Sequence, residues 1–300
     1  MGLSVHLENK IGTDVSSLRI VRHHTPLERW ELVIRRPDPR LQPHVIEYQG
    51  YVETAAARAI RRREVPWPGV VLIINFGPAF RLTDPRVIAR PADYGSFVAG
   101  LYDSYVVTES TGLSHCIQVN FTPIGARLFF QLPMDTIANR TVHFDDVLGA
   151  AGGLLPEQLH DTPTWDARFA LLDSFIASRV FQAEPPSPKV VWAWRQLQLP
   201  GDDRRIGAIA AELGWSPRHL IARFRDHIGV PPRTLARIVR FHRVVGWLDG
   251  QEEVRWAELA HRAGYYDQAH FNRDFRELAG STPSELLRRR VAGGGGIVEE

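Results

Sequence analysis

The chain has 300 residues, of which 44% are hydrophobic and 23% are charged, as in an ordinary soluble globular protein. This length is more than one core usually holds, so we expect two domains. No run approaches about 18 consecutive apolar residues, and the first twenty residues are too polar for a signal peptide, which indicates the cytoplasm and no membrane. Cys116 is the only cysteine, which excludes disulfide scaffolds and thiolate metal clusters within one chain.

The net charge of +2 is distributed unevenly along the chain. Residues 1–187 hold 18 Lys+Arg against 20 Asp+Glu, whereas residues 188–291 hold 18 against 12. A basic segment attached to a nearly neutral one indicates a polyanionic partner.

The first 121 residues show strand-like patterns. Short segments rich in Val, Ile, Tyr and Phe are separated by Gly, Pro and Asp, as expected for an antiparallel barrel or sandwich. The predicted strands are 29–36, 44–53, 69–77, 96–107 and 114–121.

Apolar residues then recur at helical spacing, which predicts helices over 123–132, 145–159 and 164–180. In the last of these helices one apolar stripe is formed by Phe169, Leu172, Phe175 and Ile176. Two interpretations are open, because the stripe suits either a dimer interface or packing against the chain's own sheet. The following segment, "FQAEPPSPKV", is rich in proline and predicts a linker.

After this linker the pattern is helical throughout. Ser216 followed by Pro217 is a typical helix start, and Gly229 followed by two prolines is a typical end. A longer helix is predicted over 234–248, and Asp267 is a second candidate N-cap.

A twelve-residue pattern occurs twice in this region, as "FRDHIGVPPRTL" (224–235) and "FRELAGSTPSEL" (275–286). Upstream of each copy, a small residue and a glycine four positions later (Ala210 with Gly214, Ala260 with Gly264) suit two short helices that meet at a tight turn. The repetition predicts two helix-turn-helix units.

The stretch "AELAHRAGYYDQAHFNRDFRELAGSTPSEL" (257–286) closely matches the signature of AraC/XylS-family transcription regulators. The whole segment from about 190 to 290 resembles the C-terminal DNA-binding domain of that family. The resemblance implies an α+β protein of two domains, with a cupin-like N-terminal β-barrel or sandwich carrying helices and an all-α double helix-turn-helix domain. It implies double-stranded DNA, a small-molecule effector, RNA polymerase and a second copy of the chain as partners. The expected organisation is a sensing and dimerisation domain (1–184), a linker (185–189), a DNA-binding domain (190–291) and a disordered tail (292–300).

The outward faces of the two recognition helices supply the candidate DNA-binding residues. Arg suits guanine and Gln or Asn suits adenine, whereas the two apolar residues of the first helix offer contact only to a thymine methyl. For each residue a phosphate contact or plain solvated surface is the alternative. The candidates are Arg218, Ile221, Ala222 and Arg225 on the first helix and Gln268, Ala269, His270, Asn272, Arg273 and Arg276 on the second.

Four arginines recur along the helix that links the two units, and a solvated face with local ion pairs is the expectation for Arg233, Arg237, Arg240 and Arg243. No His-x-His with a downstream Glu occurs at cupin metal-site spacing, and no phosphate loop is present, so neither metal nor cofactor nor enzymatic activity is expected. The alternative is a cupin-type metal enzyme domain that carries a DNA-binding module.

Overall fold

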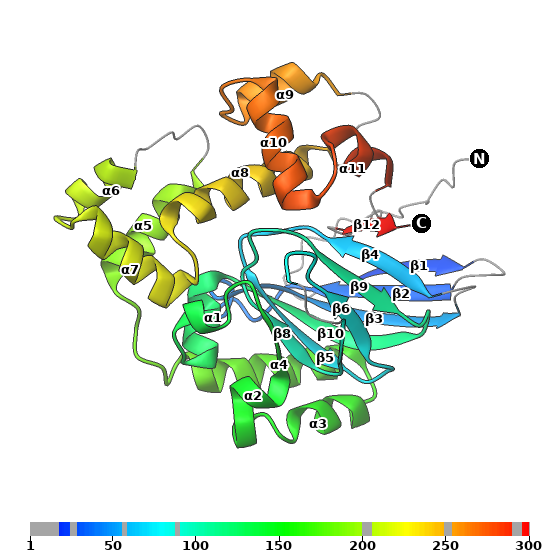
Figure 1. Ribbon diagram of the computed structural model, residues 1–300. Helices are drawn as coiled ribbons and strands as arrows, with labels where there is room; N and C mark the ends of the chain where they lie inside the picture. Colours follow the sequence, from blue (N-terminus) through cyan, green and yellow to red (C-terminus); the bar gives the residue numbers. More distant parts are fainter. Residues whose placement is uncertain are drawn as a thin grey trace.

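A β-rich N-terminal part and an all-helical C-terminal part make up the computed structural model (Figure 1). The structure describes residues 18–24, 29–55, 59–87, 91–199, 206–248, 254–289 and 296–299. None of the helices in these ranges combines the length and the apolar character that crossing a bilayer requires.

The described strands form two antiparallel sheets, and neither sheet closes on itself. The larger has the order β1-β2-β3-β10-β5-β8-β11, and the smaller has the order β12-β4-β9-β6-β7. A barrel and a sandwich were both expected for this part, and two open sheets favour the sandwich. The strands are β1 (Arg19–His24), β2 (Arg29–Arg35), β3 (Val45–Ala55), β4 (Ile60–Glu64), β5 (Val70–Asn75), β6 (Phe80–Thr83), β7 (Ala92–Tyr94), β8 (Phe97–Ala99), β9 (Val106–Ser110), β10 (Ser114–Phe121), β11 (Thr141–His143) and β12 (Gly296–Glu299).

One predicted strand, 96–107, is two strands in the structure. Its first part, β8, pairs with β5 in the larger sheet, and its last part, β9, pairs with β4 and β6 in the smaller one. The segment between them crosses from one sheet to the other. At this crossing a Cβ on Gly100 would lie 1.9 Å from the carbonyl oxygen of Ile137, so only glycine fits.

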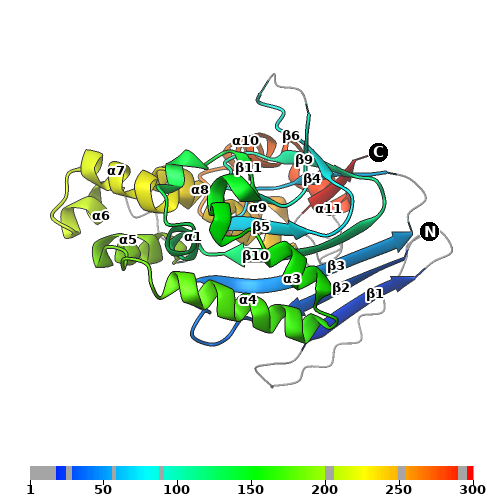
Figure 2. The ribbon, with the colours of Figure 1, turned by 90° about the horizontal axis from the view of Figure 1, so that it is seen from below.

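Helices cover the larger sheet on one side (Figure 2). They are α1 (Pro123–Phe130), η1 (Met134–Thr136), α2 (Phe144–Leu148), η2 (Gly149–Ala151), α3 (Leu155–Asp161) and α4 (Trp165–Val180). The single helix predicted over 145–159 is therefore wrong. Gly149, with φ +52° and ψ −142°, leaves the helical region and ends α2 early.

The apolar stripe of α4 packs within its own chain. Phe169, Leu172 and Ile176 are fully buried, and the Phe169 ring stacks on Tyr48 of β3 with centroids 5.5 Å apart. The Tyr48 hydroxyl donates to Asp173 at 2.8 Å, which fixes the helix on the sheet. Of the two interpretations, packing against the chain's own sheet is the one the structure shows.

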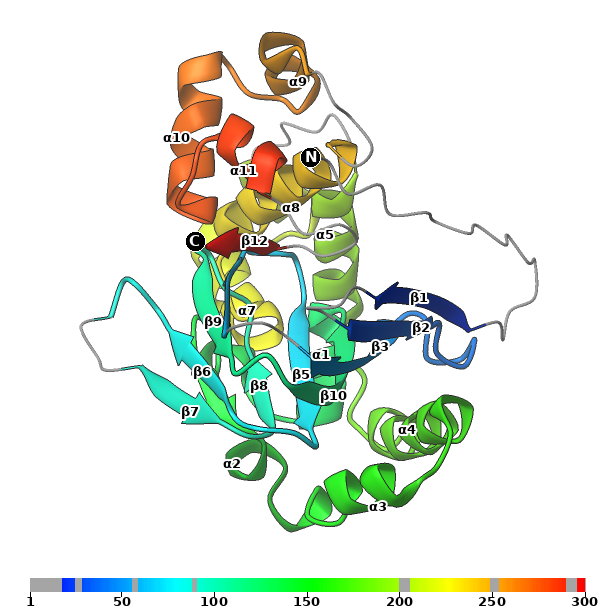
Figure 3. The same ribbon diagram turned by 90° about the vertical axis from the view of Figure 1, so that its right-hand side faces the viewer.

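The C-terminal part is built from seven helices within the described residues, and α8 joins two groups of them (Figures 1 and 3). The linker predicted over 185–189 is too long by two residues, because Pro188 already begins a helix behind Ser187. The helices are α5 (Pro188–Gln198), α6 (Ile206–Glu212), α7 (Pro217–Ile228), α8 (Pro232–Trp247), α9 (Trp256–Arg262), α10 (Gln268–Ala279) and α11 (Pro283–Arg289).

The disordered tail expected over 292–300 is wrong for residues 296–299, which form β12 and pair antiparallel with β4. Residues 292–295 and 300 lie outside the described residues. Ile297 is 3% exposed and belongs to the main core, so burial of one apolar side chain and backbone pairing hold this strand.

We expect removal of residues 292–300 to lower the free energy of unfolding by about 1.5–3 kcal/mol, because the burial of Ile297 is lost. Urea unfolding of the full and shortened chains measures this difference. Equal midpoints and slopes would show that β12 adds nothing to stability.

The second helix-turn-helix unit also contacts the N-terminal part directly. Arg63 of β4 donates to the carbonyl oxygens of Ala279 at 3.1 Å and Gly280 at 2.7 Å, at the end of α10. The same guanidinium lies over the ring of Tyr105, 4.6 Å from its centroid. A Cβ on Gly280 would lie 2.2 Å from that ring, so glycine allows this close approach. The smaller sheet thereby positions the second unit.

Candidate DNA-binding site

The two helix-turn-helix units have the same turn geometry. In the first, Gly214 has φ +68°, and the amide of Trp215 donates to Ala210 O at 2.8 Å. In the second, Gly264 has φ +81°, and the amide of Tyr265 donates to Ala260 O at 3.0 Å. Ala210 and Ala260 are both buried, as close packing of the two helices requires. The predicted roles of the small residue and the glycine are confirmed.

Each recognition helix begins with a side-chain cap. Ser216 Oγ accepts from the amide of His219 at 3.1 Å at the start of α7. Asp267 Oδ1 accepts from the amide of His270 at 2.7 Å at the start of α10. Both predicted caps are confirmed, and such caps satisfy amides that otherwise lack a partner.

The twelve-residue repeat has one structural meaning in both copies. Its phenylalanine is fully buried, its glycine ends the recognition helix with positive φ, and its proline starts the next helix. Its leucine is buried in the shared core. The residues are Phe224, Gly229, Pro232 and Leu235 in the first copy and Phe275, Gly280, Pro283 and Leu286 in the second.

The linking helix α8 uses its arginines inside the helical part. Arg237 Nε donates to the buried Asp274 of α10 at 2.9 Å, and the same guanidinium pairs with Glu277. Arg240 lies 4.5 Å from the ring centroid of Tyr265 and donates to Gly264 O. The solvated face with local ion pairs is therefore wrong for Arg237 and Arg240, because both are half-buried and their carboxylate partners lie on α10. These contacts attach the second unit to the linking helix.

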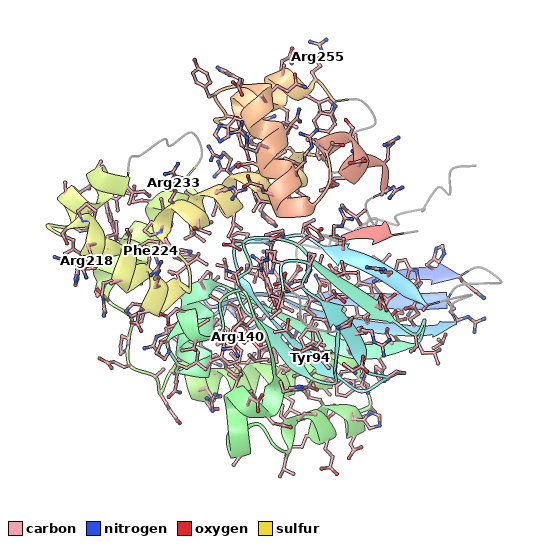
Figure 4. All side chains as sticks on the ribbon, in the orientation of Figure 1. Tyr94, Arg140, Arg218, Phe224, Arg233 and Arg255 are labelled. Carbon is pink, nitrogen blue, oxygen red and sulfur yellow. The ribbon has the colours of Figure 1, made fainter. Side chains whose placement is uncertain are left out.

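Arg243 and Arg233 differ from this pair. Arg243 Nη2 donates to the carbonyl oxygens of Gln198 at 3.1 Å and Leu199 at 3.3 Å, so it closes the end of α5. Arg233, in the first turn of α8, is exposed on the outer surface (Figure 4). It is thus the arginine of this helix that is best placed for a phosphate.

The faces predicted to approach DNA are open in the structure. On α7, Arg218 lies on the outer surface, away from the sheets, whereas Phe224 is buried (Figure 4). The exposed candidates are Arg218, Ala222, Arg225, Gln268, Ala269, Arg273 and Arg276, and the half-buried ones are Ile221, His270 and Asn272.

His270 is the candidate with the most local packing. Its ring meets Tyr265 edge-to-face, with centroids 5.3 Å apart. The neighbouring Tyr266, for which the sequence predicts no role, is 93% exposed in the turn just before α10. The sequence signal for Tyr266 is the pair Tyr265–Tyr266 itself. Because the Tyr265 ring is buried in the turn, the next side chain, that of Tyr266, points outward. Tyr266 joins the candidates as a hydroxyl donor beside the second recognition helix.

Other reactive groups do not gather into a second centre in the described ranges. No three His, Cys, Asp or Glu side chains there lie close enough together to hold a metal ion. Cys116 is buried between the sheets, and burial raises the pKa of its thiol to about 12. A thiol in this state is a poor nucleophile.

Comparison with known proteins supports this description. Residues 209–289 match a family described as a helix-turn-helix domain, and residues 34–143 match a domain of unknown function (DUF6597). The HTH-type transcriptional regulator GlxA of Rhizobium meliloti (strain 1021) is 36% identical over 75 residues. This match covers 20% of the present chain and 23% of GlxA, so the chain spans less than a quarter of that relative.

Two solved structures are similar to different extents. ToxT from Vibrio cholerae O395 has a TM-score of 0.44 at 12% identity, covering 77% of this chain and 96% of ToxT. The C-terminal domain of AraT, a response regulator from Geobacillus stearothermophilus, has a TM-score of 0.33 at 25% identity, covering 36% of this chain and 90% of that domain.

Two helix-turn-helix units joined by one helix define a DNA-binding protein with two recognition helices. Within that class, the C-terminal part of this chain is an AraC-type helix-turn-helix domain, and the resemblance to the AraC/XylS family is confirmed.

Proposed function

We propose that the chain is a sequence-specific transcription regulator whose two recognition helices, α7 and α10, read successive major grooves of one duplex. The observation that carries this proposal is the duplicated turn geometry beneath two exposed faces. The 16 residues of α8 span about 24 Å at about 1.5 Å per residue. With the flanking turns, this length suits two helices about 34 Å apart, one turn of the duplex.

In this proposal the second recognition helix, α10, is more selective for base sequence than the first, α7. Gln268, Asn272 and Arg273 carry hydrogen-bonding groups that match base edges, whereas the first helix offers Ile221 and Ala222. Selection of bound sequences from random duplexes tests this assignment, with a site of two reading zones about ten base pairs apart as the expected result. Selection of no preferred sequence would remove the proposal.

The N-terminal part is proposed to bind a small-molecule effector. Arg62, Glu64 and Thr108 form a polar cluster beside the apolar core between the two sheets, and Thr108 Oγ1 donates to Glu64 at 3.2 Å. Burial raises the pKa of the Glu64 carboxyl. All three side chains are half-buried, and polar groups beside an apolar surface support a ligand of matching polarity.

A homodimer, contact with RNA polymerase and a cytoplasmic location complete the proposal. These three points rest on the family resemblance. The α4 stripe, which suited either a dimer interface or the chain's own sheet, is buried within the chain and gives the dimer no support. Sedimentation of the full chain at tens of micromolar tests the dimer, and a monomer there would contradict it.

We expect Arg273→Ala to reduce affinity for the best selected duplex by about 1–3 kcal/mol and to relax the preference at one base pair. The reason is that Arg273 is exposed on the outer face of α10, where a guanidinium can bind a guanine edge. Fluorescence anisotropy on specific and scrambled duplexes gives both affinities. Equal losses on the two duplexes would establish a phosphate contact instead.

The matched control is Arg225→Ala on α7. Arg225 is exposed and is the second residue of the first copy of the repeat, as Arg276 is of the second copy. If Arg225 contacts phosphate, the variant should weaken binding to all duplexes alike and flatten the salt slope by about one unit. A loss confined to one sequence would make Arg225 a base reader.

A further inference from the structure

Strand β4 has one face toward the polar cluster between the sheets and the other toward the second helix-turn-helix unit. Side chains alternate between the two faces of a strand, so Arg62 and Glu64 lie on one face and Arg63 on the other. Arg62 Nη2 donates to the hydroxyl of Tyr51, on β3 of the larger sheet, at 3.5 Å, and Glu64 accepts from Thr108 at 3.2 Å. The face with Arg62 and Glu64 therefore belongs to the space between the two sheets.

The N-terminal part caps the C-terminal end of the second recognition helix, α10. The last carbonyl oxygens of a helix have no partner within the helix. At this end Arg63 donates to Ala279 O at 3.1 Å and to Gly280 O at 2.7 Å. Ser104, just before β9, donates to Glu277 O at 3.2 Å. The helix dipole also favours a guanidinium at this end, so Arg63 holds α10 by charge as well as by hydrogen bonds.

The C-terminal part also holds β4 along the edge that β9 leaves open. Strand β12 follows α11 in the chain and contacts both α11 and β4 (Figure 1). Its Ile297 is the partner of Arg63, and residues directly opposite in an antiparallel pair share a face. The buried Ile297 thus lies on the same face as the guanidinium that caps α10. A displacement of β4 therefore moves the end of α10 or breaks these contacts.

The two faces of β4 are tied together by the backbone. Burial is the main cause that raises the pKa of Glu64, and Arg62 and the Thr108 hydroxyl lower it, so the state of this carboxyl depends on the partners present in the cluster. A ligand that takes a hydrogen bond or a charge from these groups displaces Arg62 or Glu64. Consecutive Cα atoms stay about 3.8 Å apart, so Arg63, which lies between these two residues, moves with them.

We propose that β4 couples the polar cluster between the sheets to the second recognition helix, and that Arg63 is the residue that positions α10. A polar ligand in the cluster acts on Arg62 and Glu64, and Arg63 carries the displacement to the carbonyl end of α10. The reading face moves with that end, because the 12 residues of α10 form one helix about 18 Å long. The role of the cluster as effector site rests on the proposed function, whereas the link through β4 does not.

The test is amide hydrogen exchange of the full chain, followed by mass spectrometry, over residues 276–284 at the end of α10. Arg63→Gln should accelerate exchange there by about tenfold or more, because the helix end loses a charged donor. Thr108→Val removes the hydroxyl that donates to Glu64 on the opposite face, and it should accelerate exchange in the same segment by about threefold or more. The end of α7 (225–229) should be unchanged in both variants. Acceleration in Arg63→Gln but none in Thr108→Val would overturn the proposal.

Thr54→Val is the matched control, because it makes the same change at an exposed position of β3 outside the cluster, and it should leave exchange over 276–284 unchanged. In the double variant of Arg63→Gln and Thr108→Val, exchange should be no faster than in Arg63→Gln alone, since both changes act through one strand. Independent multiplication of the two effects would overturn the proposal. Should Arg63→Gln fail to fold, Arg63→Lys takes its place, because it keeps the charge without the planar fork, and the same comparisons apply.

Fluorescence anisotropy with a selected duplex and its single-base variants separates this proposal from the proposed function. Arg63→Gln should relax the base preference in the zone read by α10 and leave the preference in the zone read by α7 unchanged, whereas a general loss of stability would affect both zones alike. Exchange coupling between the two faces of β4 without DNA binding would keep the link and remove the regulator. Sequence-specific DNA binding without exchange coupling would keep the regulator and remove the link.

Discussion

DNA affinity of the full chain should fall by about 10³- to 10⁵-fold when the salt concentration rises from about 50 to 200 mM, if about six to ten phosphates are contacted. The physical reason is release of counterions from the duplex when exposed cations replace them. Exposed arginines on the helical part supply such cations, namely Arg218, Arg225, Arg233, Arg273, Arg276 and Arg288. Fluorescence anisotropy on the best selected duplex, repeated at several salt concentrations, measures the slope.

A control separates this effect from a general loss of folding in salt. Circular dichroism of the free protein at each concentration should stay unchanged, because the cores of both parts are apolar and are not weakened by screening. A nearly flat salt titration with the fold intact would contradict DNA binding through these arginines. It would also remove the proposed function.

Local signals made the helical part predictable from the sequence. Ser216, Pro217 and Gly229 act within one or two turns of their own helix, so their roles follow from backbone chemistry without knowledge of the rest of the chain. The helical period then placed the outward faces of α7 and α10 in agreement with their exposure. What these faces read remains a prediction.

The sheets were less predictable, because pairing partners lie far apart in sequence. Strand β10 pairs with both β3 and β5, and no local pattern specifies that order. The short strand β4, "IRRRE", has no apolar alternation and escaped detection. A run of glycines indicated disorder for the tail, whereas long-range burial of Ile297 orders β12.

A cavity of about 560 Å³ between α1, the linker and α7 was not predictable from the sequence for the same reason. Arg127, Glu184 and His227 come from three separate segments that no motif connects. Each is individually an ordinary polar residue in a helix or a linker. Only the packing of α1 against α7 brings them together, so the sequence by itself offered no signal.

Asp274→Ala should lower the free energy of unfolding by about 3–5 kcal/mol, because it removes the buried partner of a charged group. Asp274 is 6% exposed on the inner side of α10, and its Oδ1 accepts from Arg237 Nε of α8 at 2.9 Å. Arg240 Nη2 lies 3.9 Å from the other oxygen. The variant would leave two arginines of the linking helix without the carboxylate between them. Urea unfolding followed by circular dichroism measures the loss.

Glu277→Ala is the matched control, because it removes the other carboxylate that pairs with Arg237. The Glu277 side chain is 54% exposed, so its removal should cost no more than about 1 kcal/mol. The difference between the two variants therefore measures burial rather than charge. If both cost the same small amount, Asp274 does not anchor α10 to the linking helix. A large cost confined to Asp274→Ala would show that the second reading face is held in place through this buried carboxylate.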